Sequence, residues 1–230
     1  MGSPSRFKNG LTNVAIGDPL DQYGLPDPSQ WHTYFSDFDS YTAGDWVVTE
    51  TDAGATQALT AGNGGWLLVT NTAADNDLVS LQKTPAAFTL DATKKALFKC
   101  RFKVSDATQS DLAIGLQIVD TTPLAVTDGI WFRKDDGDAL LDFIVQKDDT
   151  TGKSESLAVG TVVSDTFITV AWSYNGNGVV SAFVDNNKVV EISTASYFPD
   201  SILTITMAVQ NGEAVAKTMT VDSVFAAIER

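Results

Sequence analysis

The feature that most constrains this chain is the stretch Lys95–Val104, in which every second side chain is apolar and those between are Lys or Arg, except Leu97. Successive side chains of a β-strand point to opposite faces, so this stretch predicts a strand with one apolar and one polar face. Five side chains share the apolar face: Ala96, Phe98, Cys100, Phe102 and Val104. We therefore expect a strand here that covers one side of a hydrophobic core.

Short segments of the same kind, separated by turn-forming clusters, fill the chain from about residue 33 onward, and helical periodicity is nearly absent. Turn chemistry predicts hairpins around Asp135–Asp138 and Asp185–Lys188, because these residues tolerate the backbone of a tight bend. The other expected strands are at 66–71, 78–83, 111–120, 130–134, 140–147, 154–159, 166–174, 179–184, 189–193, 203–210 and 219–228. Roughly a dozen strands indicate an all-β sandwich or barrel, and 230 residues suit a single such domain.

Residues 1–35 differ from the rest, because they are rich in Gly, Pro, Asn and Asp and show no period of a helix or strand. They nevertheless contain apolar side chains at intervals. We interpret residues 1–35 as an extended N-terminal arm and residues 36–230 as the domain. The expected anchors, with which the arm docks onto its own domain or a neighbour, are Phe7, Leu11, Val14 and Trp31.

The formal charge of -14 excludes some partners. An acidic surface repels phosphates, so we expect no binding to nucleic acid and none to anionic membranes. The first residues contain no apolar run like that of a signal peptide, and no stretch approaches the length of a membrane helix. We expect synthesis in a cytoplasm.

The second half of the domain resembles concanavalin A-like lectin and glucanase jelly rolls. The resemblance rests on a strand that carries Trp172, followed by a strand that ends in Val184–Val189, with Asn186 where that family usually has Gly. Met219–Phe225 is similar to the closing strand of these folds, and Phe38, Asp39 and Trp46 are similar to their opening strand. The resemblance implies an antiparallel jelly-roll β-sandwich over about residues 36–230.

The arm resembles the start of structural proteins of tailed bacteriophages, through Arg6–Val14, Leu25–Pro28 and Tyr34–Asp39. This resemblance implies a virion protein assembled in the host cytoplasm, with a role in capsid decoration or stabilisation. Its partners would be the major capsid protein or other virion subunits. A homo-oligomer follows by analogy, with a trimer plausible at capsid sites of threefold symmetry. The alternative is a carbohydrate-binding module, or an adhesin or fibre tethered to the virion.

Common catalytic patterns are missing from the sequence. Glucanases on this fold need a Glu-x-Asp-x-x-Glu run, and the five Glu residues are dispersed. His32 is the sole histidine and lies in the arm, and Cys100 alternates with Phe98 and Phe102 as a buried apolar side chain would. Acids at 135–138 and 148–149 offer oxygen ligands for Ca²⁺, although hairpin tips favour Asp for turn reasons alone. We therefore expect no enzyme, no cofactor and no metal.

Two surfaces remain as candidate binding sites. A glycan would need aromatic rings that face outward, and Trp66, Trp131 and Tyr174 qualify only if they do so. The polar face of the strand expected at Lys95–Val104 carries a row of cations, although the domain as a whole is acidic. We predict that this row docks onto an acidic capsid surface. Its members are Lys95, Lys99, Arg101 and Lys103.

Overall fold

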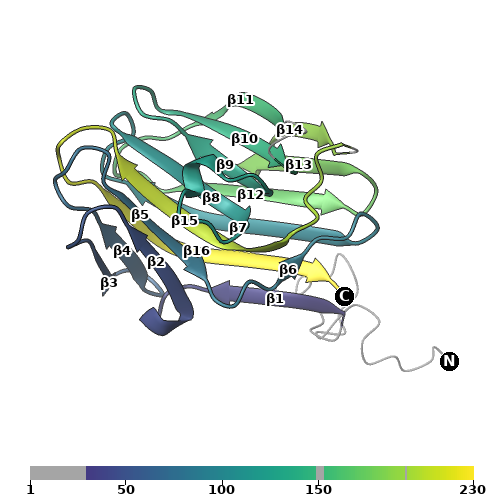
Figure 1. Ribbon diagram of the computed structural model, residues 1–230, viewed down its shortest axis with the longest axis horizontal. Coiled ribbons are helices and arrows are strands. Elements are labelled where there is room, and N and C mark those ends of the chain that lie inside the picture. The colour runs from purple at the N-terminus through teal and green to yellow at the C-terminus, as the bar shows by residue number, and fades with distance from the viewer. Residues whose placement is uncertain (1–29, 149–152, 195) are drawn as a thin grey trace.

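Two antiparallel β-sheets packed face to face make up almost all of the structure, a computed structural model that describes residues 30–148, 153–194 and 196–230 (Figure 1). Each sheet has eight strands. The predicted all-β jelly-roll sandwich is therefore confirmed. Three of the predicted anchors, Phe7, Leu11 and Val14, lie outside the described residues.

The first sheet has the strand order β14-β13-β12-β7-β16-β4-β3, and β1 also pairs with β16. Its strands are β1 (Trp31–Ser36), β3 (Thr56–Thr60), β4 (Trp66–Thr70), β7 (Lys95–Val104), β12 (Ile168–Asn175), β13 (Val179–Val184), β14 (Asn187–Ser193) and β16 (Thr218–Glu229). The strand predicted from alternation, β7, lies near the middle of this sheet between β12 and β16.

The second sheet has the order β11-β10-β9-β8-β15-β5-β2, and the short strand β6 also pairs with β15. Its strands are β2 (Trp46–Glu50), β5 (Leu78–Lys83), β6 (Phe88–Thr89), β8 (Ser110–Gln117), β9 (Gly129–Lys134), β10 (Leu140–Gln146), β11 (Lys153–Thr161) and β15 (Ile202–Asn211).

The main core lies between the two sheets and is formed by the inward faces of their central strands. From β7 it receives Phe98, Cys100 and Phe102, all with no exposed surface, as the alternation predicts. Trp172 of β12 stacks on Phe98 with 6.3 Å between ring centroids. Burying such rings removes a large apolar area from water, which is the main source of stability for a chain without disulfides.

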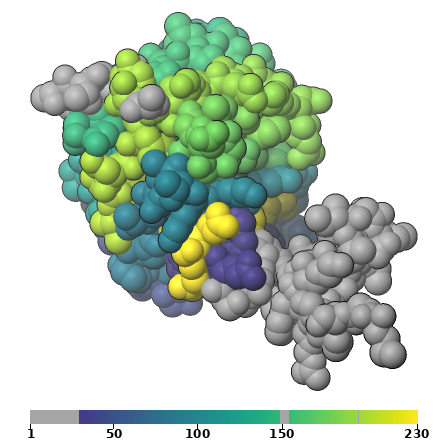
Figure 2. Space-filling model, turned by 90° about the vertical axis from the view of Figure 1, so that its right-hand side faces the viewer, coloured from purple at the N-terminus to yellow at the C-terminus, as the bar shows by residue number. Residues whose placement is uncertain are grey.

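Strand β1 joins the last part of the predicted arm to the sandwich. Trp31 pairs with Glu229 and Ser36 with Val224, so residues 31–35, the end of the predicted arm, dock onto the first sheet as a strand. The backbone N–H of Arg230 donates to the carbonyl of Gln30 at 2.7 Å. Figure 2 shows the C-terminal residues in yellow beside β1 in purple. Within the described residues, no helix is long and apolar enough to cross a membrane.

Candidate functional site

The middle of the outward face of the second sheet is covered by a segment of the chain itself. The covering segment, residues 118–128, connects β8 to β9, and its ends are joined by a hydrogen bond from the Ile118 N–H to the Asp128 carbonyl at 3.2 Å. Val126 of this segment is 2% exposed and packs in a second, smaller apolar cluster with Trp131. The side chain of Gln82 also fastens the segment, because it donates to the Ile118 carbonyl and accepts from the Asp120 N–H, both at 3.0 Å.

One end of the covering segment lies where several strands of the second sheet begin or end. The register places Thr204, Gln117, Gly129 and Gln146 in one row across β15, β8, β9 and β10. Acidic residues follow just beyond this row. Asp128 precedes β9, Asp148 follows β10 and Asp200 precedes β15, and one carboxylate oxygen from each lies within 4.8 Å of the others. We call these three residues the carboxylate cluster.

Asp128 is the buried member of the carboxylate cluster. It is 2% exposed, and its Oδ2 accepts a hydrogen bond from the Ser201 hydroxyl at 3.2 Å. Its Oδ1 is buried with no hydrogen-bond partner among the described residues. Burial, together with the negative charges of Asp200 and Asp148, raises the pKa of Asp128 to about 6. Nearby, the ammonium group of Lys147 pairs with Asp200 at 2.5 Å.

A pocket of about 420 Å³ opens beside the carboxylate cluster. Its apolar wall includes Leu90, Phe198 and Pro199, and its polar wall includes Lys147 and Asp200. The lining comes from three stretches that are distant in sequence. Figure 2 looks onto this end of the sandwich, where the blue segment near residue 90 lies beside the yellow-green segment that precedes β15.

Phe198 is held in the pocket wall by Tyr174 of β12. The two ring centroids are 4.3 Å apart. The Tyr174 hydroxyl donates to the Ala92 carbonyl at 2.6 Å and accepts from the Gly178 N–H at 2.9 Å. The half-buried Phe198 ring is thus a fixed apolar surface beside hydrogen-bonding groups, which is the composition typical of small-molecule sites.

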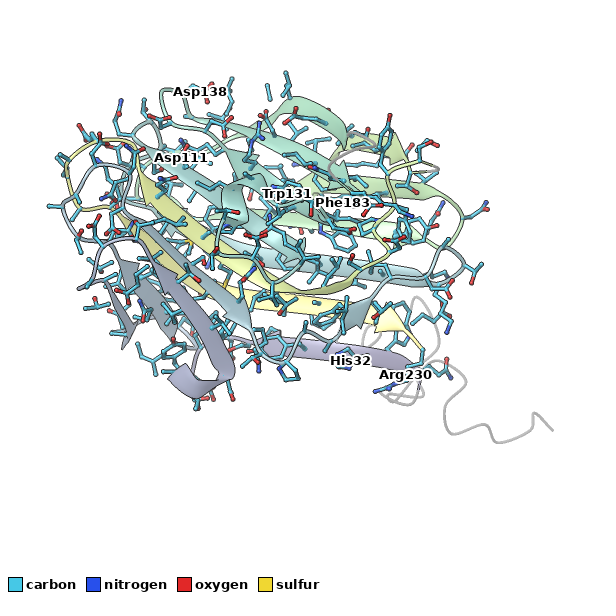
Figure 3. All side chains as sticks on the ribbon, viewed as in Figure 1. His32, Asp111, Trp131, Asp138, Phe183 and Arg230 are labelled. Atoms are coloured by element: carbon cyan, nitrogen blue, oxygen red, sulfur yellow. The ribbon has the colours of Figure 1, made fainter. Side chains whose placement is uncertain are left out.

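The three aromatic residues that the sequence offers as contacts for a glycan lie in different environments. Tyr174 is 2% exposed and supports the pocket from behind. Trp131 points outward from the second sheet but is only 1% exposed, because the covering segment packs over it (Figure 3). Trp66 is half-buried on the outward face of the first sheet, where its ring lies 5.1 Å from that of Phe167.

The predicted row of cations lies on the outward face of β7, and part of it is engaged within the molecule. Arg101 pairs with Asp222 at 3.0 Å and lies 4.2 Å above the centre of the Phe167 ring. Lys103 lies 5.6 Å above the Trp66 ring. Lys95 and Lys99 are exposed. Docking of this row onto a capsid stays a prediction, as do the oligomeric state, the glycan partner and the virion location.

The two residues that the sequence excludes from catalysis do not line the pocket. His32 lies on β1 with its ring 5.0 Å from Phe88, and burial lowers its pKa. Cys100 is fully buried, and burial raises the pKa of its thiol. Of the acids considered as Ca²⁺ ligands, Asp148 belongs to the carboxylate cluster, whereas Asp149 lies outside the described residues.

Sequence reasoning missed the carboxylate cluster as a group. Its members are far apart in the chain, and only the strand order brings them together. The available signal was that each acid stands at the boundary of a segment with strand character. That signal becomes specific only when β15 is known to lie two strands away from β9.

No family model matches this chain, and no curated protein matches it. Solved structures do. An endo-1,3-β-glucanase from Streptomyces sioyaensis superposes with a TM-score of 0.64 at 13% identity, covering 89% of this chain and 99% of that one. A protein of unknown function from Shewanella oneidensis gives 0.61 at 13%, covering 94% and 95%. The carbohydrate recognition domain of Emp47p gives 0.60 at 16%, covering 89% and 99%.

These neighbours correct the expectation that the chain is no enzyme, because glucanases and a lyase share its fold. That expectation was wrong for a physical reason. It relied on the lack of one linear run of acids, and that lack does not exclude an enzyme on a fold that glucanases share. None of the three neighbours named above is described as a virion protein. They show that this chain has the concanavalin A-like jelly-roll fold, which carbohydrate-binding proteins and glucanases share.

Proposed function

We propose that this chain is a carbohydrate-binding domain whose ligand occupies the pocket between Phe198 and the Lys147–Asp200 pair. The observation that carries the proposal is this pocket of about 420 Å³, with an aromatic wall opposite charged hydrogen-bonding groups. The fold, shared with a carbohydrate recognition domain and with a glucanase, supports it. Because the covering segment occupies the middle of the outward face of the second sheet, we place the ligand at the strand ends, where the pocket opens.

The chemistry of the pocket suits a sugar. A pyranose ring has an apolar face that packs on an aromatic ring, and hydroxyl groups around its edge that donate and accept hydrogen bonds. Phe198 offers the ring, and the Asp200 carboxylate offers acceptors. The volume lies within the range of about 300–1,000 Å³ that small-molecule sites have.

The test is a glycan array with the full chain, followed by titration calorimetry with the sugars that bind. The variant Phe198→Ala removes the apolar wall, and we expect binding about five- to tenfold weaker, because a ring contact of this kind contributes roughly 1–1.5 kcal/mol. The matched control is Phe35→Ala, since Phe35 is 62% exposed on β1 of the first sheet. Circular dichroism checks that both variants fold.

Two outcomes contradict the proposal. One is an array on which no glycan binds above background. The other is a sugar that binds Phe198→Ala and the wild type equally well, since the ligand then lies elsewhere on the surface.

A capsid-docking role is the second candidate, and one observation favours it. Strand β1, which follows residues 1–29, lies beside β16, and β16 lies beside β7 with its outward row of cations. The end of the predicted arm and this row therefore share one sheet. The double variant Lys99→Glu, Arg101→Glu is expected to lose binding to capsids, as is a chain without residues 1–29. Unchanged occupancy of the particle by either would contradict the role.

A further inference from the structure

Asp128 presents an unusual arrangement for a buried carboxyl group. Its Oδ1 has no hydrogen-bond partner among the described residues, although the residue is 2% exposed. Buried polar atoms are nearly always partnered, and a buried carboxylate is costly unless it is paired with a cation or bound to a metal. The unpartnered Oδ1 is therefore available as a ligand for a cation.

The charges around Asp128 define what kind of ligand fits. The carboxylates of Asp148 and Asp200 lie close enough that an oxygen from each of the three residues is within 4.8 Å of the others. The ammonium group of Lys147 forms an ion pair with Asp200 at 2.5 Å. Three carboxylates near one ammonium group leave an excess of negative charge, which a divalent cation would balance.

The oxygens lie close enough together for one Ca²⁺ to contact all three residues. Ca²⁺ binds oxygens at about 2.3–2.6 Å, so two oxygens on one ion lie up to about 5 Å apart. Mg²⁺ binds at about 2.0–2.1 Å, which limits the separation to about 4 Å, and it demands a stricter geometry. The limit of 4.8 Å within the cluster is compatible with a single Ca²⁺ contacting all three residues.

We propose that Asp128, Asp148 and Asp200 form a Ca²⁺ site. The site connects the C-terminal end of the covering segment to the end of β10 and to the segment that precedes β15. The ion offsets the free-energy cost of burying the Asp128 carboxylate and holds these three segments together. This inference departs from the expectation, drawn from the sequence, that the chain holds no metal. It does not depend on the proposed sugar site, because Ca²⁺ binding is measured without any glycan.

The experiment uses the full chain, treated with a chelator and dialysed, and titrated calorimetrically with CaCl₂ up to about 10 mM, a range that covers weak protein sites. We expect one binding event, and a rise in the midpoint of thermal unfolding with Ca²⁺. Asp128→Asn and, separately, the exposed-site variant Asp148→Asn each remove a ligand charge. Both should weaken binding at least about tenfold.

The matched control is Asp138→Asn, in the turn at the opposite end of the β9–β10 hairpin (Figure 3). It should bind Ca²⁺ like the wild type. The proposal would be overturned if the wild type bound no Ca²⁺, or if both cluster variants bound it as tightly as the wild type. Weakening in the control equal to that in the cluster variants, or Mg²⁺ binding as tight as that of Ca²⁺, would overturn it as well. Asp148→Asn keeps the test valid if Asp128→Asn fails to fold.

Discussion

Asp128 and Lys217 show two opposite environments for a buried charge. Lys217 is 3% exposed, and its ammonium group contacts Asp106 at 2.9 Å and Glu213 at 2.6 Å. A backbone hydrogen bond from Gln109, with the Lys217 contact, lowers the pKa of Asp106 to about 2. For Asp128 burial is the largest effect, and its pKa is raised to about 6. The ion pairs of Lys217 stabilise the folded state at neutral pH. The buried Asp128 carboxylate destabilises the folded state when no cation is bound.

The variant Asp128→Asn is therefore expected to be more stable than the wild type at pH 7 in the presence of EDTA. The folded-state pKa of Asp128, about 6, lies above that of an unfolded aspartate, about 3.9, so the folded state binds more protons between these values. The wild type loses stability as the pH rises through this window, and the variant does not. The gain at pH 7 should be about 1–3 kcal/mol and vanish near pH 4.

Chemical denaturation at pH 4, 5, 6 and 7 measures this difference. Asp106→Asn is the control of opposite sign, because the stability from a lowered pKa is present above about pH 4 and is lost as the pH falls toward 2. It should destabilise the protein at pH 7. A difference between Asp128→Asn and the wild type that does not vary with pH would contradict the assigned environment.

At the scale of elements, the covering segment depends on a few contacts. Val126 is 2% exposed against Trp131, whereas Val119 of the same segment is 53% exposed. We expect Val126→Ala to lower the free energy of unfolding by about 1–2 kcal/mol, since it leaves a cavity above the sheet. It should also speed proteolysis within residues 118–128. Val119→Ala is the control and should change neither quantity. Equal cleavage of both variants would mean that Val126 does not fasten the segment.

The elements also show what the sequence can and cannot reveal. The predicted ranges 95–104, 78–83 and 179–184 match β7, β5 and β13 because alternation and turn chemistry are local properties. The turn at Asp185 and Asn186 has the positive φ angles, 48° and 65°, that these residue types tolerate. Strands β1, β3 and β6 were missed, whereas the opening strand expected at Trp46 is β2. Strands β1 and β6 pair with β16 and β15, which are distant in the sequence, and β3 pairs with the neighbouring β4.

The candidate site was harder to predict than the fold. The covering segment packs over Trp131, and Asp128 lies close to Asp200. Both are tertiary contacts, and neither produces a periodic pattern in the sequence. The alternation in β9 correctly separates Trp131 from the core-facing Phe132, but it cannot tell that a loop of the same chain packs over that ring.

At the scale of the whole molecule, the described chain returns to its starting point, because the Arg230 N–H contacts the Gln30 carbonyl. A circular permutant of residues 30–230 is expected to fold, with about four Gly or Ser residues joining Arg230 to Gln30 and new termini between Asp185 and Asn186. Linear 30–230 is the control, and both should unfold cooperatively with similar midpoints. Loss of cooperative unfolding in the permutant alone would show that chain order is required. Cooperative unfolding of the permutant would show that the sandwich forms wherever the chain begins, because its two sheets fix the strand neighbours without regard to chain order.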